Sequence, residues 1–104
     1  MQYRLIRGHV YLDHGQYKAA LADYAAARQQ YDDSPALHYN MGLCQESLGM
    51  KNLAMECFQE TLKYKPIYRE ACEKLADFYR DRYQEGNDPE DFKKAISYMN
   101  QQIE

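Results

Sequence analysis

Apolar and small residues recur at every third or fourth position along almost the whole chain, which is the spacing of helices with one buried face. Six helices are predicted, with short breaks between them. Their expected ranges are about 2–14, 17–31, 35–48, 51–64, 68–84 and 89–103. No stretch shows the alternation of apolar and polar residues that is typical of a strand. The pattern therefore predicts an all-α fold.

The breaks between the predicted helices carry start and stop signals. Gly15 and Gly49 can each take the left-handed conformation that closes a helix. Ser34 before Pro35 supplies a good N-cap followed by a good first helical position. Glu85-Gly86-Asn87 is expected to break the fifth helix. Asp88-Pro89-Glu90-Asp91 then starts the sixth with a cap, a proline and early acids.

The helical pattern repeats with a period of 34 residues. Small residues and aromatic residues recur in one register, at Gly8 and Gly42, Gly15 and Gly49, Ala20 and Ala54, and Tyr24 and Phe58. Small residues let two antiparallel helices approach closely. We expect each central glycine to face the alanine of its partner helix, with the aromatic rings filling the space beside that contact.

These residues resemble the tetratricopeptide repeat. In that family, the first helix of each pair has a small residue followed by an aromatic one, and the second has an alanine and then an aromatic residue. The matching positions are Gly8, Tyr11, Gly15, Ala20 and Tyr24 in the first repeat, Gly42, Gly49, Ala54, Phe58 and Pro66 in the second, and Ala76, Tyr79 and Ala95 in the third. The resemblance covers essentially the whole chain and implies an α-α superhelix of three helix-turn-helix repeats.

The implied repeats span about 1–34, 35–68 and 69–104 and form a single domain. The pattern continues to both ends of the chain, which is compatible with a segment of a longer protein. The third repeat is stretched, because Tyr79 and Ala95 are 16 positions apart where Gln45 and Ala54 are 9 apart, a difference of 7. We expect this stretch to lengthen the first helix and its loop, either as a tolerated surface insertion or as a feature that contacts a partner.

The resemblance also implies a function. Members of the family bind extended peptides or helices of other proteins in a concave groove lined by the first helix of each pair, with no enzymatic centre. The groove residues carried over to this chain are Leu5, His9, Leu12, Tyr39, Asn40, Leu43, Glu46, Glu73, Lys74, Asp77 and Arg80. A clamp for the acidic tails of heat-shock chaperones is not expected, since Glu70 stands where that subtype needs a cation.

The two halves of this predicted groove differ in character. The early half is apolar through Leu5, Leu12, Tyr39 and Leu43, and the late half is acidic through Glu46, Glu70, Glu73, Asp77 and Asp81. Since unlike charges steer association, we expect a protein or peptide partner with an apolar anchor and a basic or neutral flank. The alternative, that the acids form only a solvated helix face, stays open.

Charge and composition argue against several other classes of protein. The chain has 13 Lys and Arg residues against 16 Asp and Glu, without the basic stripe of a nucleic-acid-binding protein. No apolar run is long enough for a membrane span, and no signal peptide is recognisable. Cys44, Cys57 and Cys72 all fall within helical patterns, which favours buried reduced thiols and a cytoplasmic location.

Few residues are candidates for catalysis or for binding a metal or cofactor. His9 and Asp13 lie one helical turn apart, without an evident nucleophile or substrate pocket. The cysteines and His38 lack the close pairing of a zinc site, and the glycines form no phosphate-binding loop. We therefore expect no catalytic residues, no metal and no cofactor.

Two functions remain as alternatives to an interaction scaffold. One is a small secretion or assembly chaperone that shields a client protein, and the other is a regulatory domain of a larger enzyme. Ile96, Met99 and Ile103 lie along one face of the last helix, where a solenoid normally has a polar cap. We expect this face to meet a further helix or a second copy of the chain, as in a homodimer.

Overall fold

The computed structural model describes residues 2–31 and 33–103, with the side chains of residues 5–31 and 33–100. It contains the six predicted helices: α1 (Gln2–Asp13), α2 (Tyr17–Tyr31), α3 (Pro35–Ser47), α4 (Lys51–Tyr64), α5 (Arg69–Gly86) and α6 (Pro89–Ile103). No strand occurs in the described part of the chain. The all-α prediction is confirmed.

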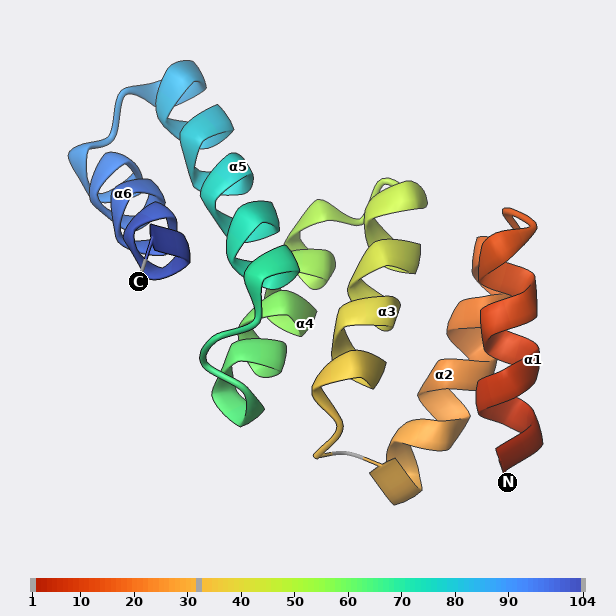
Figure 1. The fold of residues 1–104 in the computed structure, drawn as a ribbon. Coiled ribbons are helices and arrows are strands. Elements are labelled where there is room, and N and C mark those ends of the chain that lie inside the picture. Colours follow the sequence, from red (N-terminus) through yellow and green to blue (C-terminus); the bar gives the residue numbers. More distant parts are fainter. Residues whose placement is uncertain (1, 32, 104) are drawn as a thin grey trace.

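The helices form three antiparallel pairs that stack side by side, α1 with α2, α3 with α4 and α5 with α6 (Figure 1). Contacts between pairs run from α2 to α3 and from α4 to α5. The array is elongated, with extents of 43 × 27 × 20 Å, and its termini lie at opposite ends. The first helices α1, α3 and α5 lie on one side, which we call the first-helix face. This is the architecture of a helical repeat protein.

Most of the predicted helix ends are confirmed. Gly15 and Gly49 have φ values of 75° and 82°, and the Ser34 hydroxyl accepts a hydrogen bond of 3.3 Å from the Leu37 amide. The end of α5 differs from the prediction, because the helix includes Gly86 and stops at Asn87, which has φ 57°. Asparagine tolerates the left-handed conformation, so Asn87 can close the helix two residues later than expected.

The central glycines make room for aromatic rings rather than for alanines. A Cβ atom added to Gly8 would lie 3.0 Å from the ring of Tyr24, and one added to Gly42 would lie 2.5 Å from the ring of Phe58. Both rings are buried. The expected match between glycine and alanine is therefore wrong in detail, because the aromatic ring of the second helix fills the space above the glycine.

Two hydrophobic clusters form the core. The first joins α1, α2, α3 and α4 around Tyr24, Met41 and Cys44, and the second joins α4, α5 and α6 around Phe58 and Leu75. Helix α4 contributes to both clusters, and each repeat buries its apolar face against its neighbours.

A buried polar contact ties the first helix pair together. The guanidinium of Arg7 donates two hydrogen bonds, of 2.8 and 2.7 Å, to the carboxylate of Asp23. The Asp23 side chain is only 4% exposed, whereas that of Arg7 is 58% exposed. The largely exposed guanidinium of Arg7 thus neutralises the buried carboxylate of Asp23.

The three cysteines are buried thiols, as predicted. The Cys57 thiol donates a hydrogen bond of 3.0 Å to the Gln45 side-chain oxygen. Burial raises the pKa of the Cys44 thiol to about 11 and also raises the pKa values of Cys57 and Cys72. Such thiols are poor nucleophiles at neutral pH.

The stretch in the third repeat lengthens helices and not the loop. Helix α5 has 18 residues where α3 has 13. Helix α6 starts six residues before Ala95, whereas α4 starts three residues before Ala54. Only residues 87 and 88 separate α5 from α6, so the expectation of a longer loop is wrong. The extra turns pack together through the rings of Tyr83 and Phe92, whose centroids lie 5.3 Å apart.

Candidate functional site

The early part of the first-helix face is apolar but engaged in internal packing. Leu5 and Leu12 are half-buried against the first core cluster. His9 is exposed, and its Nδ1 lies 2.6 Å from the hydroxyl of Tyr24 in a hydrogen bond. At this end of the face, a partner could therefore contact only the exposed parts of side chains that already pack within the protein.

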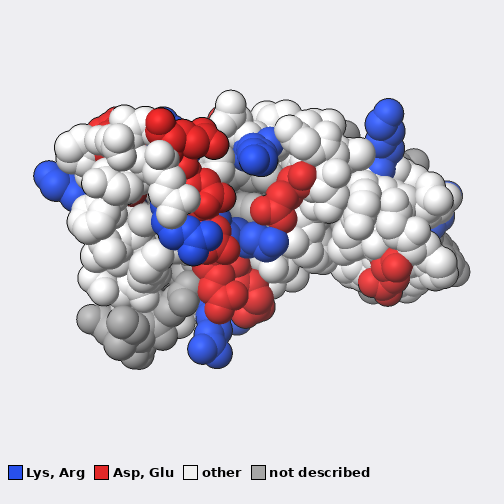
Figure 2. All heavy atoms as spheres, turned by 90° about the horizontal axis from the view of Figure 1, so that it is seen from above, with Lys and Arg blue, Asp and Glu red and all other residues white. Residues whose placement is uncertain are grey.

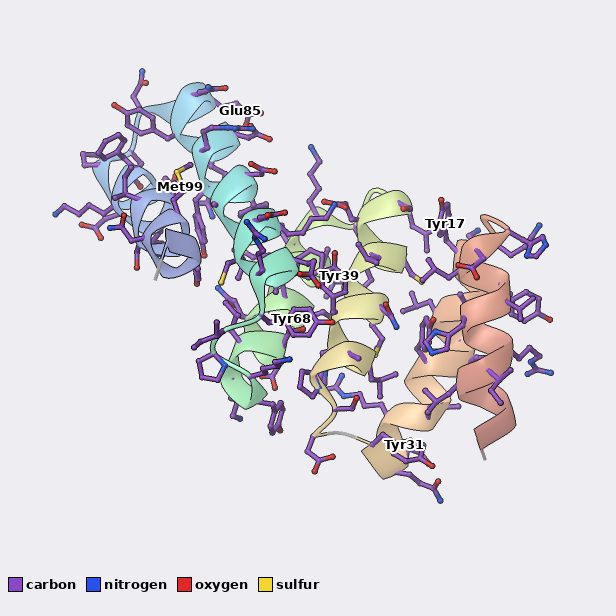
Figure 3. All side chains as sticks on the ribbon, viewed as in Figure 1. Tyr17, Tyr31, Tyr39, Tyr68, Glu85 and Met99 are labelled. Carbon is purple, nitrogen blue, oxygen red and sulfur yellow. The ribbon has the colours of Figure 1, made fainter. Side chains whose placement is uncertain are left out.

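Tyr39 and Tyr68 form an aromatic patch in the middle of the face (Figure 3). The Tyr39 ring lies 5.3 Å from that of Tyr68 and 5.6 Å from that of Phe58, between centroids. Leu43 is half-buried in the same cluster, and Asn40 is also half-buried. Burial, and then the charge of Glu70, raise the pKa of the Tyr39 hydroxyl, which therefore stays neutral at physiological pH.

The late part of the face is charged, as the sequence indicates. Glu46 accepts a hydrogen bond of 2.8 Å from Lys74, which links α3 to α5. Arg80 lies 3.5 Å from Asp77 and 3.6 Å from Asp81, and Glu73 lies 3.7 Å from Arg69. Figure 2 shows acidic and basic side chains gathered near the middle of the molecule in that view. The acids thus have basic neighbours, mostly at exposed positions where pairing is weak.

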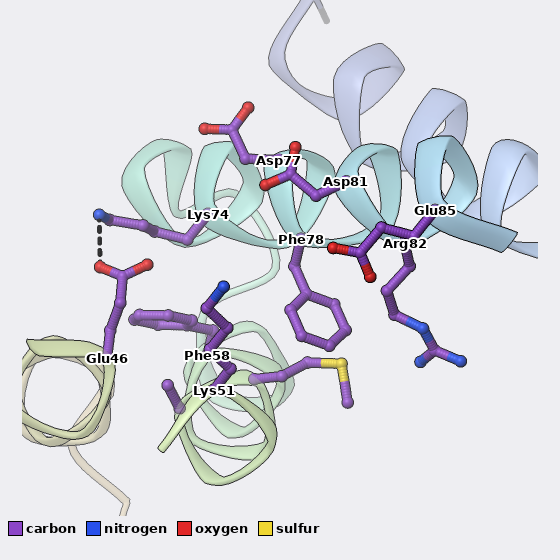
Figure 4. Close-up of a pocket in the computed structure, with 11 residues that line it drawn as sticks. Glu46, Lys51, Phe58, Lys74, Asp77, Phe78, Asp81, Arg82 and Glu85 are labelled. Atoms are coloured by element: carbon purple, nitrogen blue, oxygen red, sulfur yellow. Dashed lines mark hydrogen bonds and ion pairs between the residues drawn. The ribbon is translucent and has the colours of Figure 1, made fainter. Parts of the chain in front are cut away.

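A pocket opens between the start of α4 and the second half of α5 (Figure 4). Apolar side chains from both helices line it, and charged side chains surround them. The lining residues are Glu46, Lys51, Ala54, Met55, Phe58, Lys74, Asp77, Phe78, Asp81, Arg82 and Glu85. Sequence reasoning identified Glu46, Lys74 and Asp77 as site residues but missed the contribution of α4 and of the last turns of α5.

The far end of the stack exposes apolar side chains of α6. Phe92 is 50% exposed and Ile96 is 40% exposed, while Met99 is half-buried. The side chain of Ile103, which the sequence places on the same face, lies outside the described residues.

The described residues contain no cluster of three or more His, Cys, Asp or Glu that could hold a metal ion. Within the same residues, no helix is both long and apolar enough to cross a membrane.

Comparison with known proteins agrees with the helical repeat architecture. The sequence model of the family described as "Tetratricopeptide repeat" matches residues 35–68, which contain α3 and α4. A search of curated protein sequences found no match. Residues 35–68 therefore match a tetratricopeptide repeat, and the helix pairs stacked on either side of them have the same helix-turn-helix architecture.

Solved structures share this fold. The crystal structure of MamA matches with a TM-score of 0.78 at 20% sequence identity and covers 98% of this chain. This chain spans 60% of the length of that MamA chain. A structure of a MamA mutant gives a TM-score of 0.75 at 18% identity, covering 93% of this chain and 71% of the other. The superhelical fold is therefore confirmed.

Proposed function

We propose that the protein is an interaction module, with a scaffold or assembly role, that binds a peptide or helix of a partner protein on the first-helix face. The tetratricopeptide repeat is in general a non-enzymatic protein-binding module, which supports this class. The single observation that carries the proposal is the run of aromatic, apolar and acidic side chains across α3 and α5, including the pocket between α4 and α5.

The chemistry of this face favours a partner with an apolar anchor and a basic or neutral flank. The ring of Tyr39 and the side chain of Leu43 supply apolar surface, and Glu73, Asp77 and Asp81 are exposed beside them. Long-range attraction by the acids would raise the association rate of a basic segment, and this effect would weaken with added salt.

Selection from a displayed peptide library tests this proposal. We expect the wild-type chain to enrich peptides that combine an apolar residue with Lys or Arg. The double variant Glu73→Lys with Asp77→Lys should lose these peptides. A control with the same change in net charge, Glu56→Lys with Glu90→Lys, alters exposed positions of α4 and α6 and should retain them. Equal enrichment by both variants would contradict the proposal.

The exposed end of α6 supports a second proposal, self-association through this helix. Water-exposed Phe92 and Ile96 side chains are favourable contact sites for a second copy. Sedimentation velocity should show a concentration-dependent dimer that Ile96→Glu abolishes. A strictly monomeric wild type at high concentration would rule it out, and a dimer that forms only with a bound client would favour the alternative role of a chaperone.

A further inference from the structure

The junction that holds the pocket, between the second and third repeats, differs at matched positions from the junction between the first and second repeats. Glu46, Lys51 and Asp77 occupy the places that Leu12, Tyr17 and Leu43 occupy one repeat earlier, each 34 positions apart. Leu12 and Tyr17 pack against the first core cluster. The junction between the first two repeats is therefore filled by apolar side chains, whereas the next junction has charged residues at its rim and an open centre.

The floor of the pocket remains apolar. Ala54 and Phe58 are buried, and the half-buried side chains of Met55 and Phe78 line the pocket with them. Figure 4 shows the rings of Phe58 and Phe78 between the charged side chains. Leu21, which corresponds to Met55, packs against the core in the first repeat. A partner side chain that enters this pocket would cover apolar surface that the fold leaves uncovered.

The extra turns of α5 build one wall of the pocket. Arg82 and Glu85 belong to the segment by which α5 exceeds α3, and both line the opening. The Arg82 guanidinium lies 5.6 Å from the centre of the Phe78 ring and 3.6 Å from the Asp91 carboxylate. The stretch in the third repeat thus has a structural consequence at this site.

The charges around the floor favour a cationic neighbour for the bound apolar group. The lining contains four acids and three bases, of which Lys74 is already bonded to Glu46 and Arg82 is close to Asp91. Asp77 and Asp81 are about 60% exposed, and their distances to Arg80 of 3.5 and 3.6 Å are too long for strong pairing. Together with Glu85 they form an acidic rim on α5.

We propose that this pocket, the anchor pocket, binds an apolar side chain of a partner segment in which the next residue is Lys or Arg. The inference rests on the proposed function and makes it specific: the apolar anchor binds at the late part of the first-helix face. The apolar side chain lies on Met55, Phe58 and Phe78, and the cation lies against the acidic rim.

The test uses the full chain with ¹³C-labelled methionine methyl groups and three blocked synthetic hexapeptides. Met55 lies in the anchor pocket, and buried Met41 in the first core cluster serves as an internal reference. The peptides carry a central Leu-Lys, Leu-Glu or Ala-Lys pair between glycine and serine residues. The Leu-Lys peptide should shift the Met55 resonance saturably and bind about tenfold more tightly than the Leu-Glu peptide. The Ala-Lys peptide should cause almost no shift.

Two variants at one position separate filling of the pocket from loss of charge. Lys51→Tyr restores the residue type that the first repeat has there and should abolish the Met55 response to the Leu-Lys peptide. Lys51→Ala removes the same charge without filling the space, so binding should persist or become stronger.

Three results would overturn the inference: no saturable shift of Met55 with any peptide, equal binding of the Leu-Lys and Leu-Glu peptides, or an unchanged response in Lys51→Tyr. The proposed function would stand even so if library-selected peptides perturbed amides of α1, α3 and α5 while leaving Met55 unaffected. It would fail separately if no peptide were enriched by the wild-type chain.

Discussion

Glu46 of α3 and Lys74 of α5 join the second and third repeats through an ion pair of 2.8 Å at the edge of the anchor pocket. The two side chains are 41% and 34% exposed, so water and salt screen their attraction. The pair orients the rim of the pocket more than it stabilises the fold.

Glu46→Gln should therefore lower the free energy of unfolding by less than about 1 kcal/mol. Urea titration at low salt and in 1 M NaCl would measure the change, and the effect should shrink with salt. Glu56→Gln on α4 is the matched control. A loss above about 3 kcal/mol would show that the pair behaves as a buried one.

The two central glycines should respond differently to alanine. Gly8→Ala brings a Cβ to 3.0 Å from Tyr24, and Gly42→Ala brings one to 2.5 Å from Phe58. Alanine gains about 1 kcal/mol of helix propensity, against an overpacking cost of about 1–3 kcal/mol. We expect Gly8→Ala to be nearly neutral and Gly42→Ala to be clearly destabilising in thermal unfolding.

A smaller residue at the ring position provides the control for this pair. Adding Phe58→Leu to Gly42→Ala should cost less than the sum of the two single changes, since the clash is relieved. Equal effects of the two glycine substitutions would contradict the packing described above.

Removal of Arg7 should destabilise the first helix pair, because Asp23 is buried and loses two charge-assisted hydrogen bonds. Arg7→Ala is expected to cost about 1–3 kcal/mol in chemical unfolding. The double variant Arg7→Ala with Asp23→Ala should be less destabilised than the sum of the single changes predicts. Strict additivity would mean that the two side chains do not interact.

Stability should decline at alkaline pH. Burial raises the pKa of Cys44 to about 11, so the folded chain retains a proton that the unfolded chain releases above about pH 8.5. The contribution of this thiol is complete below about pH 8.5, and it is lost as the pH rises towards 11, with a slope of up to about 1.4 kcal/mol per pH unit. Burial also raises the pKa of Tyr24, which adds to the decline above about pH 10.

Urea titrations between pH 7 and 10.5 would measure this dependence. Cys44→Ala should have a shallower slope than the wild type over the same range, although it is less stable at neutral pH because of the cavity. A slope unaffected by that substitution would show that Cys44 does not cause it.

The fold could be predicted from local patterns because helix ends depend on nearby residues. Ser34, Gly15 and Gly49 mark their helix ends as expected. The end of α5 was missed, since both Gly86 and Asn87 are plausible stop signals and the packing of Tyr83 on Phe92 favours the longer helix. Tertiary contacts between α5 and α6 thus extend α5 beyond its predicted end.

The candidate site was only partly predictable. Repeat register placed Glu46, Lys74 and Asp77 near one another, but the pocket depends on how α4 and α5 pack. Tertiary packing also determines how far a leucine on the first-helix face is exposed to solvent. Leu5 and Leu12, for example, pack against the first core cluster.

The most direct test of the account maps a selected peptide onto the chain by amide chemical shifts. If the first-helix face binds the partner, perturbations should concentrate on α1, α3 and α5, with α4 affected only at its start beside the anchor pocket. Perturbations confined to α2, α6 and the outer side of α4, with Tyr39 and Asp77 unchanged, would contradict it.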